Sequence, residues 1–244
     1  MDGNGRWAQL EGRPRTEGHK RGSEAVRRTV QACRRLGVRA LTLYAFSEQN
    51  WERPRTETEA LMGLLREFLI SEKDEILAKR IRLRAVGRLQ RLPARVREVL
   101  DPLTKVTVHH SGLVLSLALS YGGREEIVDA ARALAEEVKA GKLDPRDIDE
   151  STLAREMASM DVGPVDLLIR TGGEQRLSNF VLWGAAYAEL HFSQKLWPDY
   201  DETDLFEALA AYQTRERRFG RLPTALETRD EGGDLPLCGT SAQL

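Results

Sequence analysis

Residues 39–47, RALTLYAFS, decide the fold class of this 244-residue chain, because their strand-forming and apolar side chains are typical of a buried strand. Just before them, Val26, Val30 and Cys33 recur at helical spacing, and Gly37 ends that pattern. A helix followed by a strand is one repeating unit of an α/β domain. The rest of the chain can therefore be searched for the same unit.

The helix-and-strand order continues through most of the sequence. Helices are predicted at residues 56–69, from residue 94 and from residue 124, and strands at residues 81–87, 113–120 and 165–170. Connections of this length suit parallel strands. We predict a single α/β domain over residues 1–220 with a mostly parallel central sheet covered by helices, followed by a disordered tail over residues 221–244.

Charge and composition narrow the function classes. The chain has 37 basic and 38 acidic residues, a net charge of −1, which argues against a nucleic-acid partner. Its two cysteines give no disulfide framework, and the sequence has neither a signal peptide nor a long apolar run. We expect a cytoplasmic protein in which any anion site is local.

Two stretches have the composition of phosphate-binding loops. In MDGNGRWA, residues 1–8, Gly3 and Gly5 permit a tight turn that presents N–H groups, and Arg6 supplies a fork of donors. In RTGGEQRLSN, residues 170–179, two arginines flank two glycines before an apolar segment that we predict to be helical. Each stretch alone also fits an ordinary turn or a capped helix, but two in one α/β domain favour a pair of phosphate sites.

Other basic stretches are less specific. In GRPRTEGHKRG, residues 12–22, most charges are expected to be solvated and one or two to reach a phosphate. SEQNWERPR, residues 47–55, is predicted to be a loop with an exposed Trp51 that closes over a ligand. KRIRLRAVGRLQRLPARVR, residues 79–97, is interpreted as a strand with one solvated face, with contact to an anionic membrane surface as the less favoured alternative.

Two carboxylates are candidates for metal binding. Asp2 lies within the first phosphate-binding stretch and Glu189 follows the second. Oxygen ligands beside phosphates are typical of Mg²⁺, and no zinc-binding spacing is present.

Six collinear motifs, together covering roughly residues 1–220, resemble the cis-prenyltransferase family. They are MDGNGRWA, GHKRG, LTLYAFSEQNWERPR, YGGREEIVDAAR, VDLLIRTGGEQRLSNFVLWGAAYAELHF, and LWPDYDETDLFEAL followed by RERRFG. The resemblance implies Mg²⁺-dependent condensation of isopentenyl diphosphate onto an allylic diphosphate such as farnesyl diphosphate. The implied product is a long polyprenyl diphosphate of the undecaprenyl class, a carrier lipid for cell-wall synthesis.

The resemblance also assigns roles to individual residues. It implies that Asp2 positions Mg²⁺, that Glu189 is a second metal carboxylate, and that Asn50 takes part in proton removal. The implied contacts to the substrates are Gly3, Asn4, Gly5, Arg6, Trp7, Arg15, His19, Ser47, Trp51, Arg53, Arg170, Arg176 and Ser178. Arg218 and Gly220 are implied to complete the site of a neighbouring subunit in a homodimer. The residues alone also allow a structural His19, and they favour core packing over an apolar tunnel for the helix face at residues 61–69.

The chain departs from the family pattern in three places. Gln49 stands where a glutamate is usual before Asn50, and Ser120 stands where asparagine is common. The apolar strand that normally precedes the opening motif is not in this sequence, so we expect the native product to begin upstream of Met1.

Three other functions are weighed against this one. A catalytically silent subunit of a heteromeric enzyme is expected to lack the opening acid and the phosphate arginines, yet Asp2, Arg170 and Arg176 are present. A shorter-chain synthase is disfavoured by the small Ala45 before the loop. A nucleotide-dependent phosphotransferase is disfavoured because the sequence contains no G-x-x-x-x-G-K-[ST] motif.

Overall fold

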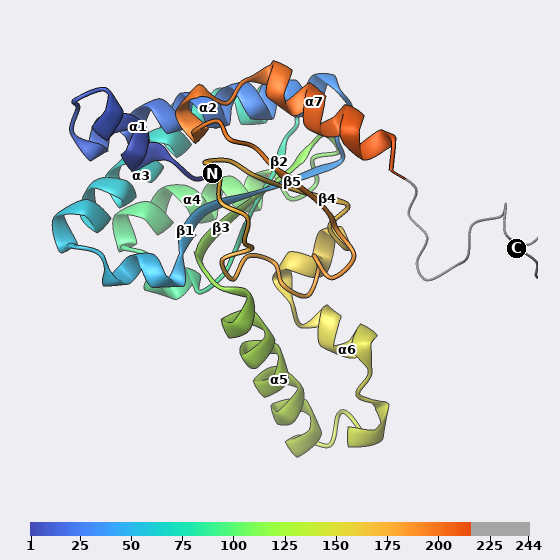
Figure 1. Ribbon diagram of the computed structural model, residues 1–244. Helices are drawn as coiled ribbons and strands as arrows, with labels where there is room; N and C mark the ends of the chain where they lie inside the picture. Colours follow the sequence, from blue (N-terminus) through green and yellow to red (C-terminus); the bar gives the residue numbers. More distant parts are fainter. Residues whose placement is uncertain (216–244) are drawn as a thin grey trace, which may run out of the picture.

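The computed structural model describes residues 1–215 and has the expected α/β architecture (Figure 1). Strands β1 (Ala40–Ser47), β2 (Arg82–Val86) and β3 (Val114–Tyr121) form a parallel sheet in the order β1-β3-β2. Strands β4 (Leu167–Arg170) and β5 (Glu189–Phe192) form a second parallel sheet. The predicted parallel arrangement is confirmed, with its strands divided between two sheets. The predicted tail, residues 221–244, lies outside the described residues.

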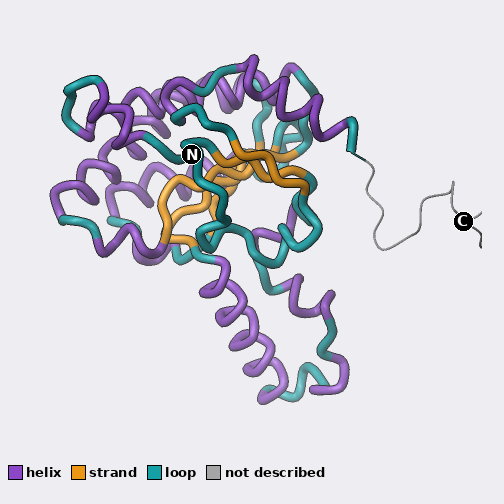
Figure 2. The backbone as a smooth tube through the Cα atoms, in the orientation of Figure 1, coloured by secondary structure: helices purple, strands orange, loops and turns teal. Residues whose placement is uncertain are grey.

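Helices surround the strands on most sides (Figure 2). They are α1 (Asn4–Leu10), α2 (Arg15–Arg35), α3 (Arg55–Ala78), α4 (Ala94–Val106), α5 (Gly123–Lys139), α6 (Glu150–Arg155) and α7 (Glu202–Gln213). Helices α5 and α6 extend away from the rest of the molecule (Figure 1). Among residues 1–215, no helix combines the length and the apolarity that a membrane crossing requires.

The central strand β3 separates two apolar clusters. Leu115, Leu117 and Leu119 pack in the larger cluster with apolar side chains of α2, α3 and α4. Ala118, on the other face, packs in a smaller cluster with Val181 and with Leu168 of the second sheet. Successive side chains of a strand point to opposite faces, so β3, which is buried along almost its whole length, contributes to both clusters. Each fully buried leucine stabilises the fold by about 1.5–3 kcal/mol.

The apolar face of α3 packs in the larger cluster, as the residues alone favoured. Leu69 is fully buried, while Leu61, Leu65 and Phe68 are partly buried against the same cluster. A cavity of about 20 Å³ remains between α2 and α3, next to Phe68. The structure therefore shows core packing along this face.

The prediction of a helix after residue 179 is wrong. Residues 180–181 are bends, residues 182–187 form turns, and Glu189 begins β5. Ser178, Asn179 and Val181 have positive φ angles, of 50°, 63° and 38°, which are incompatible with a continuous helix. Pairing of β5 with β4 provides hydrogen bonds that a helix there would forgo.

The prediction that the charges in and just after β2 are solvated is also wrong for two arginines. The Arg84 side chain is only 13% exposed and pairs with Asp161. Arg88, just after the strand, is part-buried, and its Nε donates to Asp129 Oδ2 over 2.8 Å. Acidic residues from later in the chain cover these charges, a pairing that a local sequence pattern does not reveal.

Candidate active site

The first phosphate-binding stretch forms a turn at the start of α1. Gly3 caps the helix with φ 108°, a conformation that side chains oppose, and an added Cβ would lie 2.8 Å from Leu196 Cδ2. The N–H groups of the first helical turn have no partners within a helix, which makes them suitable for an anion. Gly3, Asn4, Gly5 and Arg6 therefore share one short turn, as the sequence predicts.

This turn is held laterally by two other segments. The Asp2 N–H donates to Thr171 Oγ1 over 2.9 Å, and the Thr171 hydroxyl donates to the Asp2 carbonyl over the same distance. The Trp197 N–H also donates to that carbonyl, at 2.9 Å. Both main-chain polar groups of Asp2 are thus hydrogen-bonded. These bonds hold the backbone of Asp2, and therefore its carboxylate, in a defined position.

The Asp2 carboxylate joins the first stretch to the second. Arg170 Nη2 donates to Asp2 Oδ2 over 2.9 Å, and Arg6 Nη2 lies 3.5 Å from Asp2 Oδ1. Partial burial raises the pKa of Asp2, but the hydrogen bond from Arg170 and the charges of Arg170 and Arg6 outweigh it and lower the pKa. Asp2 is therefore ionised at neutral pH. We call this pair the Asp2–Arg170 junction.

The second stretch arranges its donors around Arg170. Arg170 Nη1 donates to Ser178 Oγ over 2.7 Å and also to the carbonyl of Arg176. The turn at Gly172, with φ 88°, brings the main chain close to Arg6, since a Cβ there would lie 2.5 Å from Arg6 Nη2. Arg176 Nη1 donates to Glu174 Oε2 over 2.5 Å. The structure thus brings Arg170, Arg176 and Ser178 together, at a loop and not at a helix N-terminus.

Three further predicted substrate contacts meet at one carboxylate. Arg53 Nη1 lies 3.0 Å from Glu57 Oε1, Arg15 Nη2 lies 3.5 Å from it, and His19 Nε2 lies 3.8 Å from it. Burial and the charges of Arg53 and Arg15 lower the pKa of His19 despite Glu57. We call these four residues the Glu57 cluster. An added Cβ on Gly5 would lie 3.0 Å from the Arg15 guanidinium, so the cluster adjoins the first turn.

The sequence interpretation missed Glu57. It lies on the first turn of α3, four residues after Arg53. Opposite charges at positions i and i+4 are a signal that identifies the pair of Arg53 and Glu57 in the sequence. The approach of Arg15 and His19 depends instead on the packing of α2 against α3.

Asn50 lies in a short 3₁₀ helix, Glu48–Glu52, directly after β1. Its Oδ1 accepts a hydrogen bond from the Ser47 N–H over 3.1 Å, which fixes the orientation of the amide. Trp51 is half-buried and packs against Phe46, with ring centroids 4.8 Å apart. The expectation of an exposed Trp51 is therefore wrong.

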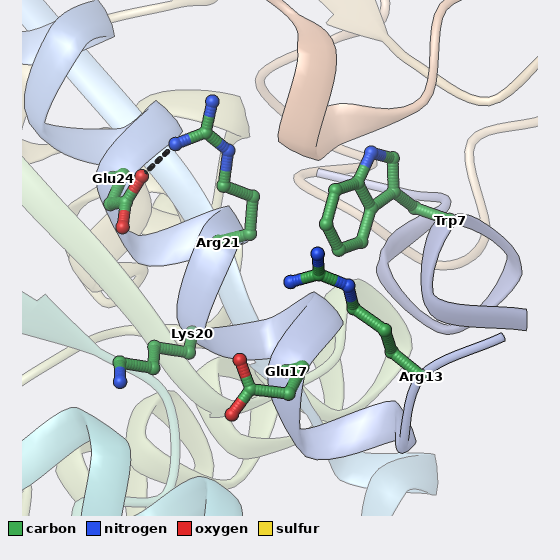
Figure 3. Close-up of a pocket in the computed structure, with 6 residues that line it drawn as sticks. All are labelled: Trp7, Arg13, Glu17, Lys20, Arg21 and Glu24. Carbon is green, nitrogen blue, oxygen red and sulfur yellow. Dashed lines mark hydrogen bonds and ion pairs between the residues drawn. The ribbon is translucent and has the colours of Figure 1, made fainter. Parts of the chain in front are cut away.

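Trp7 lies apart from these groups, beside three basic side chains of the stretch at residues 12–22. Trp7 Nε1 donates to Asp199 Oδ1 over 2.9 Å. Its ring borders a cavity of about 360 Å³ between α1 and α2, lined also by Arg13, Glu17, Lys20, Arg21 and Glu24 (Figure 3). Figure 3 shows the Arg13 guanidinium beside the indole of Trp7, with its carbon 5.9 Å from the ring centroid. Arg15 and His19 thus face the site, whereas Arg13 and Arg21 line a separate surface hollow.

Glu189 does not join Asp2. In the parallel pairing of β4 with β5, Glu189 is opposite Leu167, while Arg170 is opposite Phe192, so three strand positions, about 10 Å, separate Glu189 from the end of β4 that faces Asp2. Glu189 Oε2 instead accepts from Arg215 Nη1 over 2.6 Å. Arg218 and Gly220 lie outside the described residues.

The donors present fit a magnesium ion that is completed by substrate. Asp2 is ionised and its side chain is 39% exposed, and Mg²⁺ typically takes one or two carboxylates together with phosphate oxygens and waters. Within residues 1–215, no group of three or more His, Cys, Asp or Glu side chains forms a self-sufficient metal site. Asp2 is thus the residue suited to hold the ion beside a diphosphate.

Comparisons with known proteins identify the family of the chain. Residues 1–220 match the family described as "Putative undecaprenyl diphosphate synthase". The chain is 50% identical over 220 residues to the (2E,6E)-farnesyl-diphosphate-specific ditrans,polycis-undecaprenyl-diphosphate synthase of Salmonella paratyphi A, covering 90% of this chain and 87% of that protein.

Two solved structures share the fold. One is lavandulyl diphosphate synthase from Lavandula x intermedia in complex with dimethylallyl diphosphate, with a TM-score of 0.87, 39% identity and coverage of 90% of this chain and 95% of that one. The other is a probable undecaprenyl diphosphate synthase from Campylobacter jejuni, with a TM-score of 0.73, 33% identity and coverage of 83% and 93%. The chain therefore belongs to the undecaprenyl diphosphate synthase family and is a cis-prenyltransferase.

Proposed function

We propose that this enzyme condenses isopentenyl diphosphate units onto farnesyl diphosphate, with Mg²⁺, to make undecaprenyl diphosphate. The observation that carries the proposal is the Asp2–Arg170 junction, which places two arginine-containing phosphate-binding turns side by side. A reaction between two diphosphates needs two such turns. The named activity of the Salmonella relative supports the choice of substrates.

We assign the turn of residues 2–6 and the Glu57 cluster to the allylic diphosphate, and Arg170, Arg176 and Ser178 to isopentenyl diphosphate. The allylic C–O bond breaks with its electrons going to the diphosphate. The double bond of isopentenyl diphosphate forms the new C–C bond to that carbon, and a proton is then lost. N–H groups and arginines that are already aimed at the leaving diphosphate stabilise its growing charge, and Mg²⁺ held at Asp2 would add to this. Asn50, oriented by Ser47, is assigned to the proton-removal step.

The direct test supplies the purified enzyme with farnesyl diphosphate, labelled isopentenyl diphosphate and Mg²⁺, and separates the products by length. We expect products of the undecaprenyl class and none after chelation of the metal. Absence of any condensation would favour the silent-subunit alternative, in which the chain serves another polypeptide.

A shorter product is the second candidate, because the lavandulyl diphosphate synthase shares the fold with a TM-score of 0.87. We favour a long product and propose that the chain grows along the apolar face of α3, past Ala45 in β1. Partly buried Leu61, Leu65 and Phe68 are the side chains that would yield to it. Ala45→Leu is expected to shorten the products, whereas Ala40→Leu, at the opposite end of β1, is the control that leaves their length unchanged.

Two further features belong to the proposal. We propose a homodimer in which Arg218 and Gly220 complete the neighbouring site. Light scattering of the active enzyme tests this, since a fully active monomer would contradict it.

We also propose a cytoplasmic enzyme whose contact with membranes is peripheral at most. Fractionation of cells tests this location.

A further inference from the structure

The short helix that carries Asn50 is fastened to β3 by a chain of side-chain hydrogen bonds. Trp51 Nε1 donates to Ser120 Oγ over 2.8 Å, and the Ser120 hydroxyl donates to Glu48 Oε2 over 2.7 Å. Glu48 and Trp51 are three residues apart, and a 3₁₀ helix has three residues per turn, so both lie on the face that meets Ser120. Asn50 lies between them in the sequence.

Ser120 is buried where its hydroxyl can make both hydrogen bonds. It is 1% exposed and has a positive φ of 47°, at the end of β3 where the chain turns toward α5. A hydroxyl has one hydrogen to donate and lone pairs that accept. The Ser120 hydroxyl therefore accepts from Trp51 and donates to Glu48 at the same time.

Two arginines also pair with Glu48. The Glu48 side chain is 11% exposed, and both Arg88 and Arg91 form ion pairs with it. The Arg91 guanidinium carbon also lies 5.3 Å from the centroid of the Trp51 ring. A largely buried carboxylate with two cationic partners and one hydroxyl donor is held in place, because moving it would leave those groups unpaired.

Resting on the proposed function, we propose that Glu48 and Ser120 are positioning residues that hold Asn50 in its reactive orientation by locking Trp51 to β3. Of these two residues, Ser120 is the one that departs from the family pattern, in which asparagine is common at that position. An asparagine there has a donor and an acceptor and tolerates a positive φ, which makes it a suitable conservative replacement.

The test compares Ser120→Ala with Ser120→Asn in the full-length chain. We expect Ser120→Ala to lower kcat about tenfold with KM for both substrates within about twofold, because the groups assigned to the two diphosphates remain in place while the orientation of Asn50 is lost. Ser120→Asn is expected to restore kcat to within about threefold of the wild type. Glu52→Gln, an exposed acid on the same 3₁₀ helix, is the matched control and should leave kcat unchanged.

A second readout needs no substrate. The emission of Trp51, taken as the difference between each protein and its Trp51→Phe version, should shift to longer wavelength in Ser120→Ala and not in Ser120→Asn, since the indole becomes more exposed to water. If Ser120→Ala does not fold, Glu48→Gln is measured in its place and is expected to show the same loss of kcat.

The outcomes separate this proposal from the function on which it rests. Wild-type kcat and unshifted Trp51 emission in Ser120→Ala would overturn the lock while leaving the condensation reaction intact. A loss of kcat that Ser120→Asn does not restore would also overturn it, as would a rise in KM alone. Absence of condensation in the wild type would instead reject the proposed function, and the emission shift would still report on the lock.

Discussion

The two cationic parts of the site are held in different ways. At the Asp2–Arg170 junction, Arg170 is 13% exposed and binds Asp2, Ser178 and a main-chain carbonyl at once. In the Glu57 cluster, Arg15 is 62% exposed and shares a single carboxylate with Arg53 and His19. The first arrangement is preorganised for one geometry, whereas the second is a set of charges that one carboxylate keeps together. We expect orientation to depend on the first and anion affinity on the second.

The largest effect is expected from Asp2→Ala. This change removes the metal carboxylate and leaves Arg170 and Arg6 without their shared partner, so kcat/KM should fall by more than about tenfold, or more than about 1.4 kcal/mol in the barrier. Glu11→Gln, an exposed acid at the other end of α1, is the control. Retention of a tenth or more of the turnover by a folded Asp2→Ala would remove Asp2 from the mechanism.

A matched pair of lysine substitutions sharpens the comparison directly. Arg170→Lys keeps the charge but loses the fork that binds Asp2 and Ser178 together, and we expect kcat/KM to fall about tenfold. Arg15→Lys keeps a charge that is already largely solvated and should cost no more than about threefold. Steady-state kinetics with both substrates measures this. Equal losses at the two positions would break the distinction between a preorganised part and an adaptable one.

A smaller effect is expected on the pH dependence of stability. The pKa of His19 is lowered in the folded protein from its ordinary value of 6.5, so below pH 6.5 the unfolded chain binds the proton more readily. The stability from neutral His19 is complete above pH 6.5 and is lost as the pH falls from there toward the folded pKa.

His19→Gln is therefore expected to flatten the fall in Tm between pH 7 and pH 5, as measured by thermal unfolding. Glu57→Gln should steepen it, because Glu57 is the group that raises the pKa of His19 against Arg53 and Arg15. Identical Tm profiles for the wild type and His19→Gln would contradict this account.

The sequence predicts most of the first turn and much less of the second. Gly3 requires a positive φ and Arg6 follows within one turn, so local residues alone define that motif. The apolar residues 180–190 predict a helix after the loop at residues 170–178, but turns lead instead into β5, which forms through pairing with β4. Alternating helical and strand patterns thus predict the fold class, whereas a short strand that depends on a distant partner escapes them.

The same limit applies to charges. Arg53 and Glu57 are four residues apart on the chain, and that pair is predictable. By contrast, the pairing of Arg84 with Asp161 and the separation of Glu189 from Asp2 depend on how distant segments pack. Residues that share a chemistry in the sequence therefore need not share a site.

Two separate turns, joined by Asp2 and Arg170, are proposed to hold one diphosphate each. Titration calorimetry in the presence of Mg²⁺, with isopentenyl diphosphate and with an unreactive thio analogue of farnesyl diphosphate, tests this assignment most directly. The account predicts one site for each ligand per chain, and Arg176→Ala should weaken isopentenyl diphosphate about tenfold while leaving the farnesyl analogue within about twofold. A single site for which the two ligands compete, or an equal loss of both affinities in Arg176→Ala, would contradict it.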